Sequence, residues 1–493
     1  MSQPAPPAPP AAPAPLMLSV SGARGLVGQT MTSEVARDFA AAFGSFVRAS
    51  TAQASPLLCI GRDGRPSGLE LMEAAIDGLL STGCRVIDLG IVTTPSVAVM
   101  IGKHRAAVRG GAVGGIEITA SHNPIIWNGI KCLNADGVAP PPHDADEIIR
   151  RFRDKDFVRS PLDRAKACRR DDTTNATHVE RVLASIGGVG GPDVAAIRTA
   201  KLKVVLDSIN GAGCVPGRML LEALGCQVVH INGVPTGQFA HTPEPIEENL
   251  RDLAARTAKE KAACGFAQDP DADRLAIIDE TGRYIGEEYT LVLAVKRVLQ
   301  VSPLAPGSAG GSKRVLATNL STSRMIDDVA AQFGATVLRT AVGEANVVAA
   351  MKPHGSHAIL GGEGNGGVIL PPVCWVRDSL SAMALTLSLI VAERKPLSAI
   401  VGGLPKYHMI KHKFDLAKIG GLAIVKPALE KVQKRFSAAR ISTVDGVRLD
   451  FDDGWVHLRP SNTEPIVRLI AEAKTESRAK GLIDEVAVAA GLK

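Results

Sequence analysis

Three aspartates at alternate positions form the pattern that most directly suggests chemistry in this sequence: Asp269, Asp271 and Asp273. Carboxylates this close repel one another unless a cation lies among them, and hard cations prefer oxygen ligands. A calcium-binding EF-hand does not fit, because Arg274 stands where that loop needs a glycine and a strand-like run follows it. The arginine favours an anionic ligand beside the metal. We therefore expect Mg²⁺, which completes its coordination with phosphate oxygens.

A second polar loop holds a serine that could act as a nucleophile or carry a phosphoryl group. The sequence TASHNP covers 119–124, follows the apolar run IEI and places Ser121 next to His122. No Gly-x-Ser-x-Gly motif surrounds Ser121, so a lipase-type hydrolase has little support. A simple turn, in which Ser121 and Asn123 bond to the local backbone, is the alternative interpretation.

Two further loops offer polar groups after strand-like runs. In the glycine-rich segment 361–367, Glu363 and Asn365 stand at alternate positions, which suits paired hydroxyl groups of a sugar. The loop 459–465 offers side chains that suit a phosphate group, namely Arg459, Ser461, Asn462 and Thr463. A plain hairpin or turn is the alternative for each loop.

The glycines Gly211, Gly213 and Gly217 follow a strand-like run and open a helix, as glycines do in dinucleotide-binding folds. Their spacing, G-x-G-x-x-x-G, does not match that motif, and Pro216 stands near the helix start. Tight packing between strand and helix explains these glycines better than a nicotinamide site.

Strand-like and helix-like segments alternate from Leu16 onwards, which predicts an α/β fold with helices packed on mixed or parallel sheets. The polar loops follow strands, where ligands bind in such sheets, so loops from several units could converge on one cleft. The charged stretch 150–172 is expected to be a solvated helix or linker. Four domains are expected after a disordered proline- and alanine-rich tail at 1–15, and they cover 16–170, 171–285, 286–403 and 404–493.

The composition is that of a globular chain, with 493 residues, 45% hydrophobic and 22% charged. Nucleic-acid binding is not expected, because the net charge is only +6 and aromatic residues make up 3%. The nearly apolar stretch 379–392 is shorter than the ~20 residues of a membrane span. Cysteines without a CxxC pair and an N-terminus without a secretory signal favour a cytoplasmic protein.

Taken in order, the motifs resemble those of the α-D-phosphohexomutase family, which contains phosphoglucomutases, phosphomannomutases and phosphoglucosamine mutases. The matching segments are SGARG (21–25), GRDGRPSG (61–68), TASHNP (119–124), NGIK (128–131), DPDADR (269–274), GEGNGG (362–367) and RPSNTEP (459–465). The resemblance spans nearly all of the chain after the tail. It implies three similar mixed α/β domains and a smaller C-terminal α+β domain around a central cleft.

The resemblance also implies a role for each polar loop. Ser121 would be the phosphoserine, and the three aspartates would hold Mg²⁺ together with its phosphate. Arg24, Lys131 and Arg274 would surround the transferring phosphoryl group. Glu363 and Asn365 would bind the sugar hydroxyls. The distal phosphate would be bound by Arg459, Ser461, Asn462 and Thr463. The partners would be sugar phosphates, with a hexose 1,6-bisphosphate as intermediate and activator, and the protein would be a monomer or homodimer.

One departure from the family pattern affects the acid–base chemistry. Glu344 follows Gly343 where some members have a histidine, so we expect Lys131, or else His122, to transfer the proton. Asn365 and Glu344 favour glucosamine phosphate as substrate, since a carboxylate near the ring suits a protonated amine. Glucose or mannose phosphate is the alternative, and a non-catalytic sugar-phosphate binding protein of the same fold is a further one.

Overall fold

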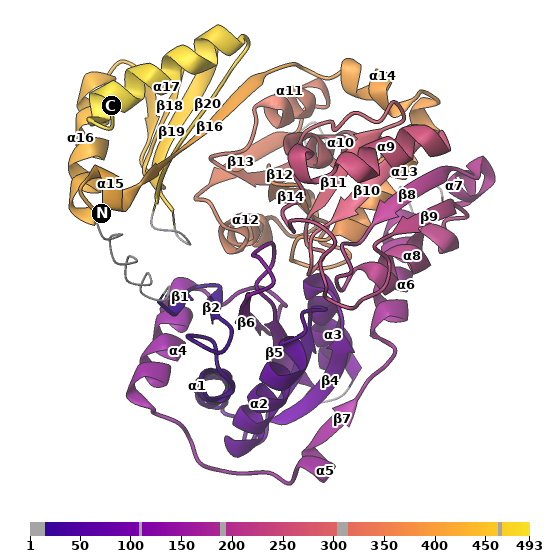
Figure 1. Cartoon of the computed structure of the whole chain (residues 1–493), viewed down its shortest axis with the longest axis vertical. Helices are drawn as coiled ribbons and strands as arrows, with labels where there is room; N and C mark the ends of the chain where they lie inside the picture. The colour runs from indigo at the N-terminus through magenta and orange to yellow at the C-terminus, as the bar shows by residue number, and fades with distance from the viewer. Residues whose placement is uncertain (1–14, 108–110, 188–193, 303–313, 462–465) are drawn as a thin grey trace, which may run out of the picture.

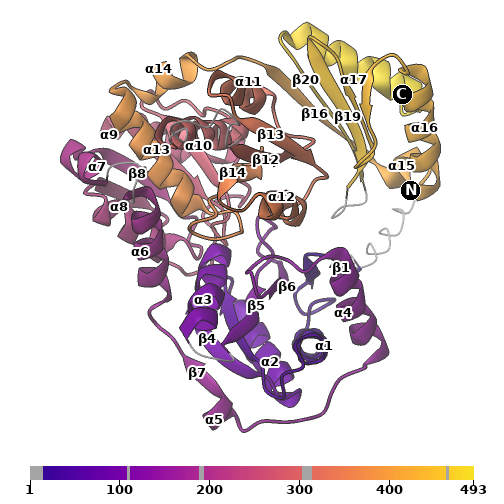
Figure 2. The same ribbon diagram turned by 180° about the vertical axis from the view of Figure 1, so that it is seen from behind.

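The structure, a computed structural model of the chain, describes residues 15–107, 111–187, 194–302, 314–461 and 466–493. The predicted tail at 1–15 lies, except for Pro15, outside these residues. The described chain forms four sheets, each with its own helices. Figure 1 shows the first domain at the bottom and the C-terminal domain at the upper left, with the second and third domains beside each other. Figure 2 shows the same arrangement of domains from behind.

The first domain is built on a seven-stranded sheet in the order β1-β2-β6-β5-β3-β4-β7. Its strands are β1 (Met17–Ser19), β2 (Gly22–Leu26), β3 (Leu57–Arg62), β4 (Arg85–Ile91), β5 (Ala112–Ile118), β6 (Trp127–Asn134) and β7 (Cys168–Arg170). Its helices are α1 (Ser33–Thr51), α2 (Gly68–Ser81), α3 (Thr94–Ala107), α4 (Pro142–Asp154) and α5 (Arg164–Ala167). The expectation of a helix or linker at 150–172 is therefore incomplete, because β7 pairs with β4 and forms one edge of this sheet. Its charged residues suit an edge strand.

The second and third domains each have a four-stranded sheet. The second domain contains α6 (Thr174–Gly187), α7 (Val194–Ala200), β8 (Lys203–Asp207), α8 (Cys214–Ala223), β9 (Gln227–Ile231), the 3₁₀ helix η1 (Glu247–Asn249), α9 (Arg251–Glu260), β10 (Cys264–Gln268) and β11 (Leu275–Asp279). The third domain contains α10 (Glu287–Val301), β12 (Val315–Asn319), α11 (Met325–Gln332), β13 (Thr336–Thr340), α12 (Glu344–Met351), the 3₁₀ helix η2 (Lys352–His357), β14 (Ala358–Glu363), β15 (Gly367–Ile369), α13 (Ser379–Glu393) and α14 (Leu397–Gly402).

These three domains repeat one path of the chain. Each has three parallel strands connected through helices, and then a short loop to an antiparallel fourth strand. The strand orders are β4-β3-β5-β6, β9-β8-β10-β11 and β13-β12-β14-β15. The loop between the third and fourth strand is 119–126 in the first domain, 269–274 in the second and 364–366 in the third. Three of the predicted functional loops therefore occupy equivalent places.

The second and third domains share a single apolar core, which includes side chains from both sheets. Helix α13 lies in this core and is buried along almost its whole length, as its apolar sequence on all sides requires. At its start, the Asp378 carboxylate accepts hydrogen bonds from the main-chain nitrogens of Leu380 and Ser381, both at 3.0 Å. The C-terminal domain has a separate core, and so has most of the first domain, although Ala98 and Val99 of α3 belong to the shared core. None of the described helices is long and apolar enough to cross a membrane.

The C-terminal domain has a five-stranded antiparallel sheet in the order β16-β20-β19-β18-β17. It contains β16 (His408–Asp415), α15 (Leu416–Ile419), the 3₁₀ helix η3 (Leu422–Ile424), α16 (Val425–Arg435), β17 (Arg440–Ser442), β18 (Val447–Asp450), β19 (Gly454–Pro460), β20 (Ile466–Ala473) and α17 (Glu476–Ala490). Its apolar core includes no residue of the third domain. Polar contacts join the two, such as that from Arg324 Nη2 to Asp450 Oδ1 at 2.8 Å. The predicted fold class, three mixed α/β domains and a smaller α+β domain, is confirmed.

Candidate active site

The loop with Ser121 is held in place by one buried arginine. Arg65 donates from Nη2 to the carbonyl oxygens of Ser121 and Asn123, at 2.6 and 2.7 Å. From Nη1 it donates to the carbonyl oxygens of Pro124 and Trp127, at 2.8 and 3.0 Å. An arginine has donors enough to bind four carbonyls at once, so this side chain fixes the whole turn between β5 and β6.

Ser121 itself has a left-handed backbone conformation, with φ of +49°. Such a conformation is unusual for a residue with a Cβ atom and needs support from its surroundings. Besides Arg65, the Thr119 hydroxyl gives that support by accepting from the Ser121 nitrogen at 2.9 Å. The Ser121 hydroxyl donates to Asp269 Oδ2 at 3.3 Å, and His122 Nδ1 lies 3.3 Å from the same hydroxyl. The two loops predicted to work together therefore meet.

The aspartate loop connects β10 and β11, so the strand expected after Arg274 is present and the EF-hand is excluded. Asp269, Asp271 and Asp273 are all buried, and an oxygen from each lies within 4.8 Å of the others. Asp271 Oδ1 and Asp273 Oδ1 accept no hydrogen bond from any residue that the structure describes. Free buried carboxylate oxygens gathered in this way fit a hard cation such as Mg²⁺.

The charges of the aspartates affect one another. Burial raises the pKa of Asp269 well above its usual range, and repulsion from Asp271 and Asp273 adds to this shift. Burial would also raise the pKa of Asp273, but the cations Arg377, Lys131 and Arg274 outweigh it and lower that pKa. The neighbouring cations therefore favour the charged form of Asp273.

Three predicted cations surround the serine and the aspartates. Arg24 Nη1 donates to Asn123 Oδ1 at 2.7 Å, and Lys131 Nζ lies 3.8 Å from Asp273 Oδ2. Arg274 Nε lies 3.8 Å from Asp273 Oδ1. Arg274 also lowers the pKa of His122 well below its usual value, and burial and Arg24 lower it further. The imidazole is therefore neutral.

The sugar loop lies between β14 and β15, and its two predicted residues differ in their contacts. Glu363 Oε1 accepts from Asn319 Nδ2 at 2.8 Å and from the Gly343 nitrogen at 3.1 Å. Glu363 Oε2 accepts from Arg377 Nη1 at 2.7 Å. Both oxygens of Glu363 thus already have partners. By contrast, the buried Oδ1 of Asn365 accepts no hydrogen bond within the described chain.

The fourth loop joins β19 and β20. Arg459 Nε donates to Asp445 Oδ2 at 2.8 Å, while its buried Nη2 has no acceptor among the described residues. The Ser461 nitrogen donates to the Ile466 carbonyl at 2.9 Å. Asn462 and Thr463 lie outside the described residues. The free donor of Arg459 is suited to an anion.

Two arginines near these loops are missing from the residues predicted to form the site. Arg65 lies in GRDGRPSG, a motif that the sequence shows, but its carbonyl partners are more than fifty residues away. Arg377 stands directly before the apolar helix α13, and its side chain contacts Asp273, Glu363 and Glu344. The only sequence signal for Arg377 is a charged pair, Arg377 and Asp378, before an apolar run.

Gly211 and Gly213, which were not interpreted as a dinucleotide-binding motif, pack beneath the aspartate loop. A Cβ atom at Gly213 would lie 2.4 Å from Gln268 Oε1, and one at Gly211 would lie 2.7 Å from the Pro270 carbonyl. Gln268 directly precedes Asp269, so these glycines let the helix approach the loop closely. The interpretation as tight strand–helix packing agrees with this geometry.

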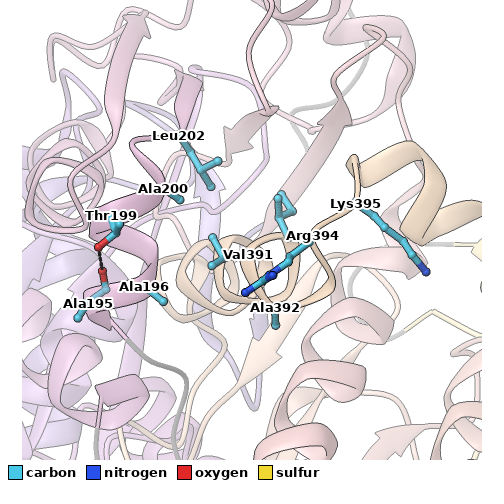
Figure 3. Close-up of a pocket in the computed structure, with 10 residues that line it drawn as sticks. Ala195, Ala196, Thr199, Ala200, Leu202, Val391, Ala392, Arg394 and Lys395 are labelled. Atoms are coloured by element: carbon cyan, nitrogen blue, oxygen red, sulfur yellow. Dashed lines mark hydrogen bonds between the residues drawn. The ribbon is translucent and has the colours of Figure 1, made fainter.

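A groove of about 770 Å³ lies elsewhere, between α7 and the end of α13. Its side chains come from residues 195–202 and 390–395, as Figure 3 shows, and include none of the predicted site residues. We place the active site at the converging loops and not at this groove, because the loops bring together buried charges and free polar atoms.

Comparison with known proteins agrees with this geometry. Models of the phosphoglucomutase/phosphomannomutase family match its α/β/α domain I at 17–159, domain II at 178–282, domain III at 287–407 and C-terminal domain at 420–489. The exact domain boundaries predicted from the sequence stay predictions.

Relatives extend over nearly the whole chain. It is 37% identical over 464 residues to the phosphoglucomutase/phosphomannomutase of Thermococcus kodakarensis, covering 94% of this chain and 96% of the relative. It is 35% identical over 471 residues to a probable phosphoglucosamine mutase of Methanopyrus kandleri, covering 94% and 95%. A phosphoglucomutase/phosphomannomutase family protein from Burkholderia thailandensis has a similar crystal structure, with a TM-score of 0.79, 29% identity and coverage of 96% and 98%. The chain therefore belongs to the phosphoglucomutase/phosphomannomutase family.

Proposed function

We propose that the protein interconverts hexose 6-phosphate and hexose 1-phosphate through a phosphoserine at Ser121 and a hexose 1,6-bisphosphate intermediate. One observation carries the proposal: the Ser121 hydroxyl lies 3.3 Å from Asp269 Oδ2, at the edge of three buried aspartates. A serine beside a cluster that fits a cation is the arrangement that phosphoryl transfer requires. The names of the relatives, phosphoglucomutase/phosphomannomutase and probable phosphoglucosamine mutase, support the same reaction.

The first half of the reaction transfers the phosphoryl group from Ser121 to the free hydroxyl of the hexose monophosphate. The bond between phosphorus and the serine oxygen breaks, and a bond to the sugar oxygen forms. Mg²⁺, when held by the three aspartates, would neutralise charge on the phosphoryl oxygens. Arg24 and Arg274 neutralise further charge from the protein side. The sugar hydroxyl loses its proton and the serine oxygen gains one; Lys131 is proposed to pass this proton between the two oxygens, and His122, 3.3 Å from the serine hydroxyl, is the alternative.

The second half returns the other phosphate of the bisphosphate to Ser121. The intermediate must turn over, so either phosphate has to be accepted at the distal position. Arg459 suits that position, because its buried Nη2 lacks an acceptor in the described chain. Ser461, Asn462 and Thr463 are proposed to complete the phosphate cradle. The polar attachment of the C-terminal domain would let it shift while the intermediate reorients.

Glucosamine phosphate is the proposed substrate, with glucose or mannose phosphate as the alternative. The free buried oxygen of Asn365 supports this choice, since it would accept a hydrogen bond from the 2-amine. Glu363 is proposed to bind a sugar hydroxyl beside it. Oε2 of Glu344 already accepts from the Arg377 nitrogen at 2.8 Å, and we assign the contact with the amine to Asn365.

The phosphoserine is tested by mass spectrometry of freshly purified protein together with a Ser121→Ala variant. We expect phosphate on Ser121 and complete loss of mutase activity in the variant. A Ser33→Ala variant serves as control, because Ser33 lies on the first turn of α1, away from the loops. A fully active Ser121→Ala protein, prepared free of wild type, would exclude the phosphoserine mechanism. A phosphorylated protein without turnover of any hexose phosphate would favour the non-catalytic binding protein.

The substrate is tested by the specificity constants for glucosamine, glucose and mannose phosphates in one coupled assay. We expect the highest kcat/KM for glucosamine phosphate, and Asn365→Ala should lower that value roughly tenfold more than the value for glucose phosphate, because a hydrogen bond to a charged amine is lost. A wild-type value for glucosamine that is tenfold or more below either neutral sugar would reverse the assignment. The mutase reaction itself would not be affected by that outcome.

A further inference from the structure

Arg377 has no part in the proposed chemistry, yet it contacts three carboxylates of the site. It lies between β15 and α13 and is buried, with 9% of its surface exposed. Its guanidinium donates hydrogen bonds to Asp273 in the aspartate loop and to Glu363 in the sugar loop, and it forms an ion pair with Glu344 at the start of α12. These three groups come from different segments, so one side chain joins parts of the site that the sequence separates.

The two Nη atoms of Arg377 point to different loops. Nη2 donates to Asp273 Oδ2, and Nη1 donates to Glu363 Oε2 at 2.7 Å. Nε lies 3.2 Å from Glu344 Oε2, which also accepts from the main-chain nitrogen of Arg377. A planar guanidinium can hold several acceptors at fixed angles, whereas a lysine ammonium acts as a point charge. The geometry therefore requires an arginine.

Main-chain contacts already hold the backbone of the aspartate loop against the third domain. The Ser379 nitrogen donates to the Ala272 carbonyl at 3.3 Å, and the Leu275 nitrogen donates to the Gly366 carbonyl at 3.0 Å. Neither contact touches the Asp273 carboxylate. Within the described chain the carboxylate accepts a hydrogen bond from Arg377, at Oδ2, while its buried Oδ1 accepts none and Lys131 and Arg274 stay 3.8 Å away.

Gly367 gives Arg377 the space to reach these groups. A Cβ atom at position 367 would lie 2.1 Å from Arg377 Cδ and 2.8 Å from its Cγ, far inside contact distance. The observed position of the Arg377 side chain therefore requires a glycine at 367, the last residue of GEGNGG. A larger residue at 367 could stay only if Arg377 moved.

We propose that Arg377 is a positioning residue that orients Asp273 for the metal and couples this orientation to the sugar loop through Glu363. The inference rests on the proposed metal site in the aspartate loop. A positioning role and a purely electrostatic role of Arg377 predict opposite changes in metal affinity when the arginine is removed. Removing a cation beside a metal ligand would tighten metal binding if charge alone mattered. Removing a positioning residue weakens metal binding, because Asp273 loses its fixed orientation.

The test measures binding of Mn²⁺ alone to the full-length protein, by the electron paramagnetic resonance signal of the free ion, without any turnover. We expect Arg377→Lys and Arg377→Met each to weaken Mn²⁺ binding tenfold or more, about 1.4 kcal/mol. Arg314→Lys is the matched control. Arg314 is also a buried arginine of the third domain, but it donates to the carbonyl oxygens of Leu299, Ser302 and Phe333. This control should lose stability and keep its Mn²⁺ affinity.

A folded Arg377→Met protein that binds Mn²⁺ as tightly as the wild type, or more tightly, would overturn the proposal. If the wild type itself bound no Mn²⁺, the metal site and not the role of Arg377 would be wrong.

Gly367→Ala tests the same inference without removing the arginine, should the Arg377 variants fail to fold. The added methyl group displaces the Arg377 side chain, so we expect the same tenfold loss of Mn²⁺ affinity. The Michaelis constant for the sugar phosphate should rise as well, because Glu363 loses its partner. Unchanged Mn²⁺ binding in a folded Gly367→Ala protein would contradict the proposed role.

Discussion

At the scale of single residues, the site depends on side chains that hold other groups as much as on those that react. Ser121 and the aspartates are easy to recognise in the sequence, because a serine can carry a phosphoryl group and clustered carboxylates can bind a metal. Arg65 does not react, but it binds four carbonyl oxygens of the serine loop and keeps a strained residue in place. Such a residue should affect the rate of turnover more than the binding of substrate.

Replacing Arg65 by lysine should therefore lower kcat at least about tenfold and change KM little, since most of the hydrogen bonds to the loop are lost while the charge stays. The loss of stability should be about 2–3 kcal/mol, at roughly 1 kcal/mol per hydrogen bond with partial compensation. Steady-state kinetics and urea unfolding measure both values. Arg62→Lys is a suitable control, because Arg62 is nearby and, within the described chain, its Nη1 donates to a single acceptor, the Asp63 carbonyl at 3.2 Å. Equal effects of the two variants would argue against a special role for Arg65.

Removing one charge from the aspartate loop should be more severe. Asp271→Asn keeps the acceptor for the Thr94 hydroxyl, which lies 2.7 Å from Oδ2, but takes away charge that a cation needs. We expect activity at saturating Mg²⁺ to fall roughly a hundredfold or more, because several kcal/mol of charge stabilisation are lost. Asp279→Asn, at the end of β11, should keep the activity, since Asp279 pairs with Arg283. Full activity of Asp271→Asn in excess chelator would exclude metal dependence.

At the scale of elements, the equivalent loops of the three mixed sheets carry most of the residues proposed for the site. Each loop connects two adjacent antiparallel strands, so both of its ends are fixed by the sheet. Helix α13 holds two of these domains together, and its first residues touch the aspartate loop. The start of this helix is built around Asp378, which also lies 3.3 Å from His178 Nε2. His178 Nδ1 in turn lies 2.9 Å from the Ser96 hydroxyl.

Asp378→Ala should destabilise the protein by about 2–4 kcal/mol, because a helix cap and the contact with the buried His178 are lost together. Chemical unfolding monitored by circular dichroism measures this change. Asp163→Ala removes the cap of the short exposed helix α5 and should cost much less. If both changes had similar small effects, Asp378 would contribute no more than an ordinary surface cap.

Much of this element structure could be predicted from the sequence, and the exceptions share one cause. The loops were predictable because each polar motif directly follows an apolar strand, so the signal is local. The strand β7 and the contacts of Arg377 were not, because they depend on partners far along the chain. Arg377 meets Asp273 across 104 positions, and no periodicity or spacing carries that information. For the same reason the contact between Glu344 and Arg377 could not be predicted, whereas the expected place of Glu344 near the sugar ring stays a prediction.

At the scale of the whole molecule, two kinds of attachment divide the chain. The second and third domains share one apolar core and should move as one body. The C-terminal domain is held to the third domain by polar contacts, among them the contact between Lys411 Nζ and Glu287 Oε1 at 2.7 Å. His457 lies in this interface. Its Nε2 donates to the Asp445 carbonyl at 2.6 Å, and its Nδ1 accepts from the Ser321 hydroxyl at 2.9 Å.

This interface should weaken in acid. Burial lowers the pKa of His457 to about 4, with a further contribution from Arg448 and Arg459, while an unfolded histidine titrates near 6.5. The unfolded chain then binds more protons, so stability is complete above about pH 6.5 and falls as the pH falls towards about 4. The total loss is about 3 kcal/mol.

Urea unfolding of the wild type and His457→Gln at pH 7.5 and pH 5 measures this part of the dependence. The variant should show a smaller difference between the two conditions, because a glutamine does not titrate. His143→Gln is the control, since His143 is exposed, and it should behave like the wild type. The same pH dependence in His457→Gln as in the wild type would assign the acid sensitivity to other groups.

The burial of Ser121 has a consequence for the life of a newly made molecule. Ser121 is only 8% exposed, and Arg65 fixes the carbonyl groups around it. A protein kinase binds its target as an extended segment, so it would have to unfold this turn before it could reach the hydroxyl. A small sugar bisphosphate can reach it in the folded protein, as the proposed reaction requires in every cycle. Under the proposed function, each newly made molecule is inactive until a sugar bisphosphate phosphorylates Ser121. The supply of sugar bisphosphate in the cell would then set how much of the enzyme is active.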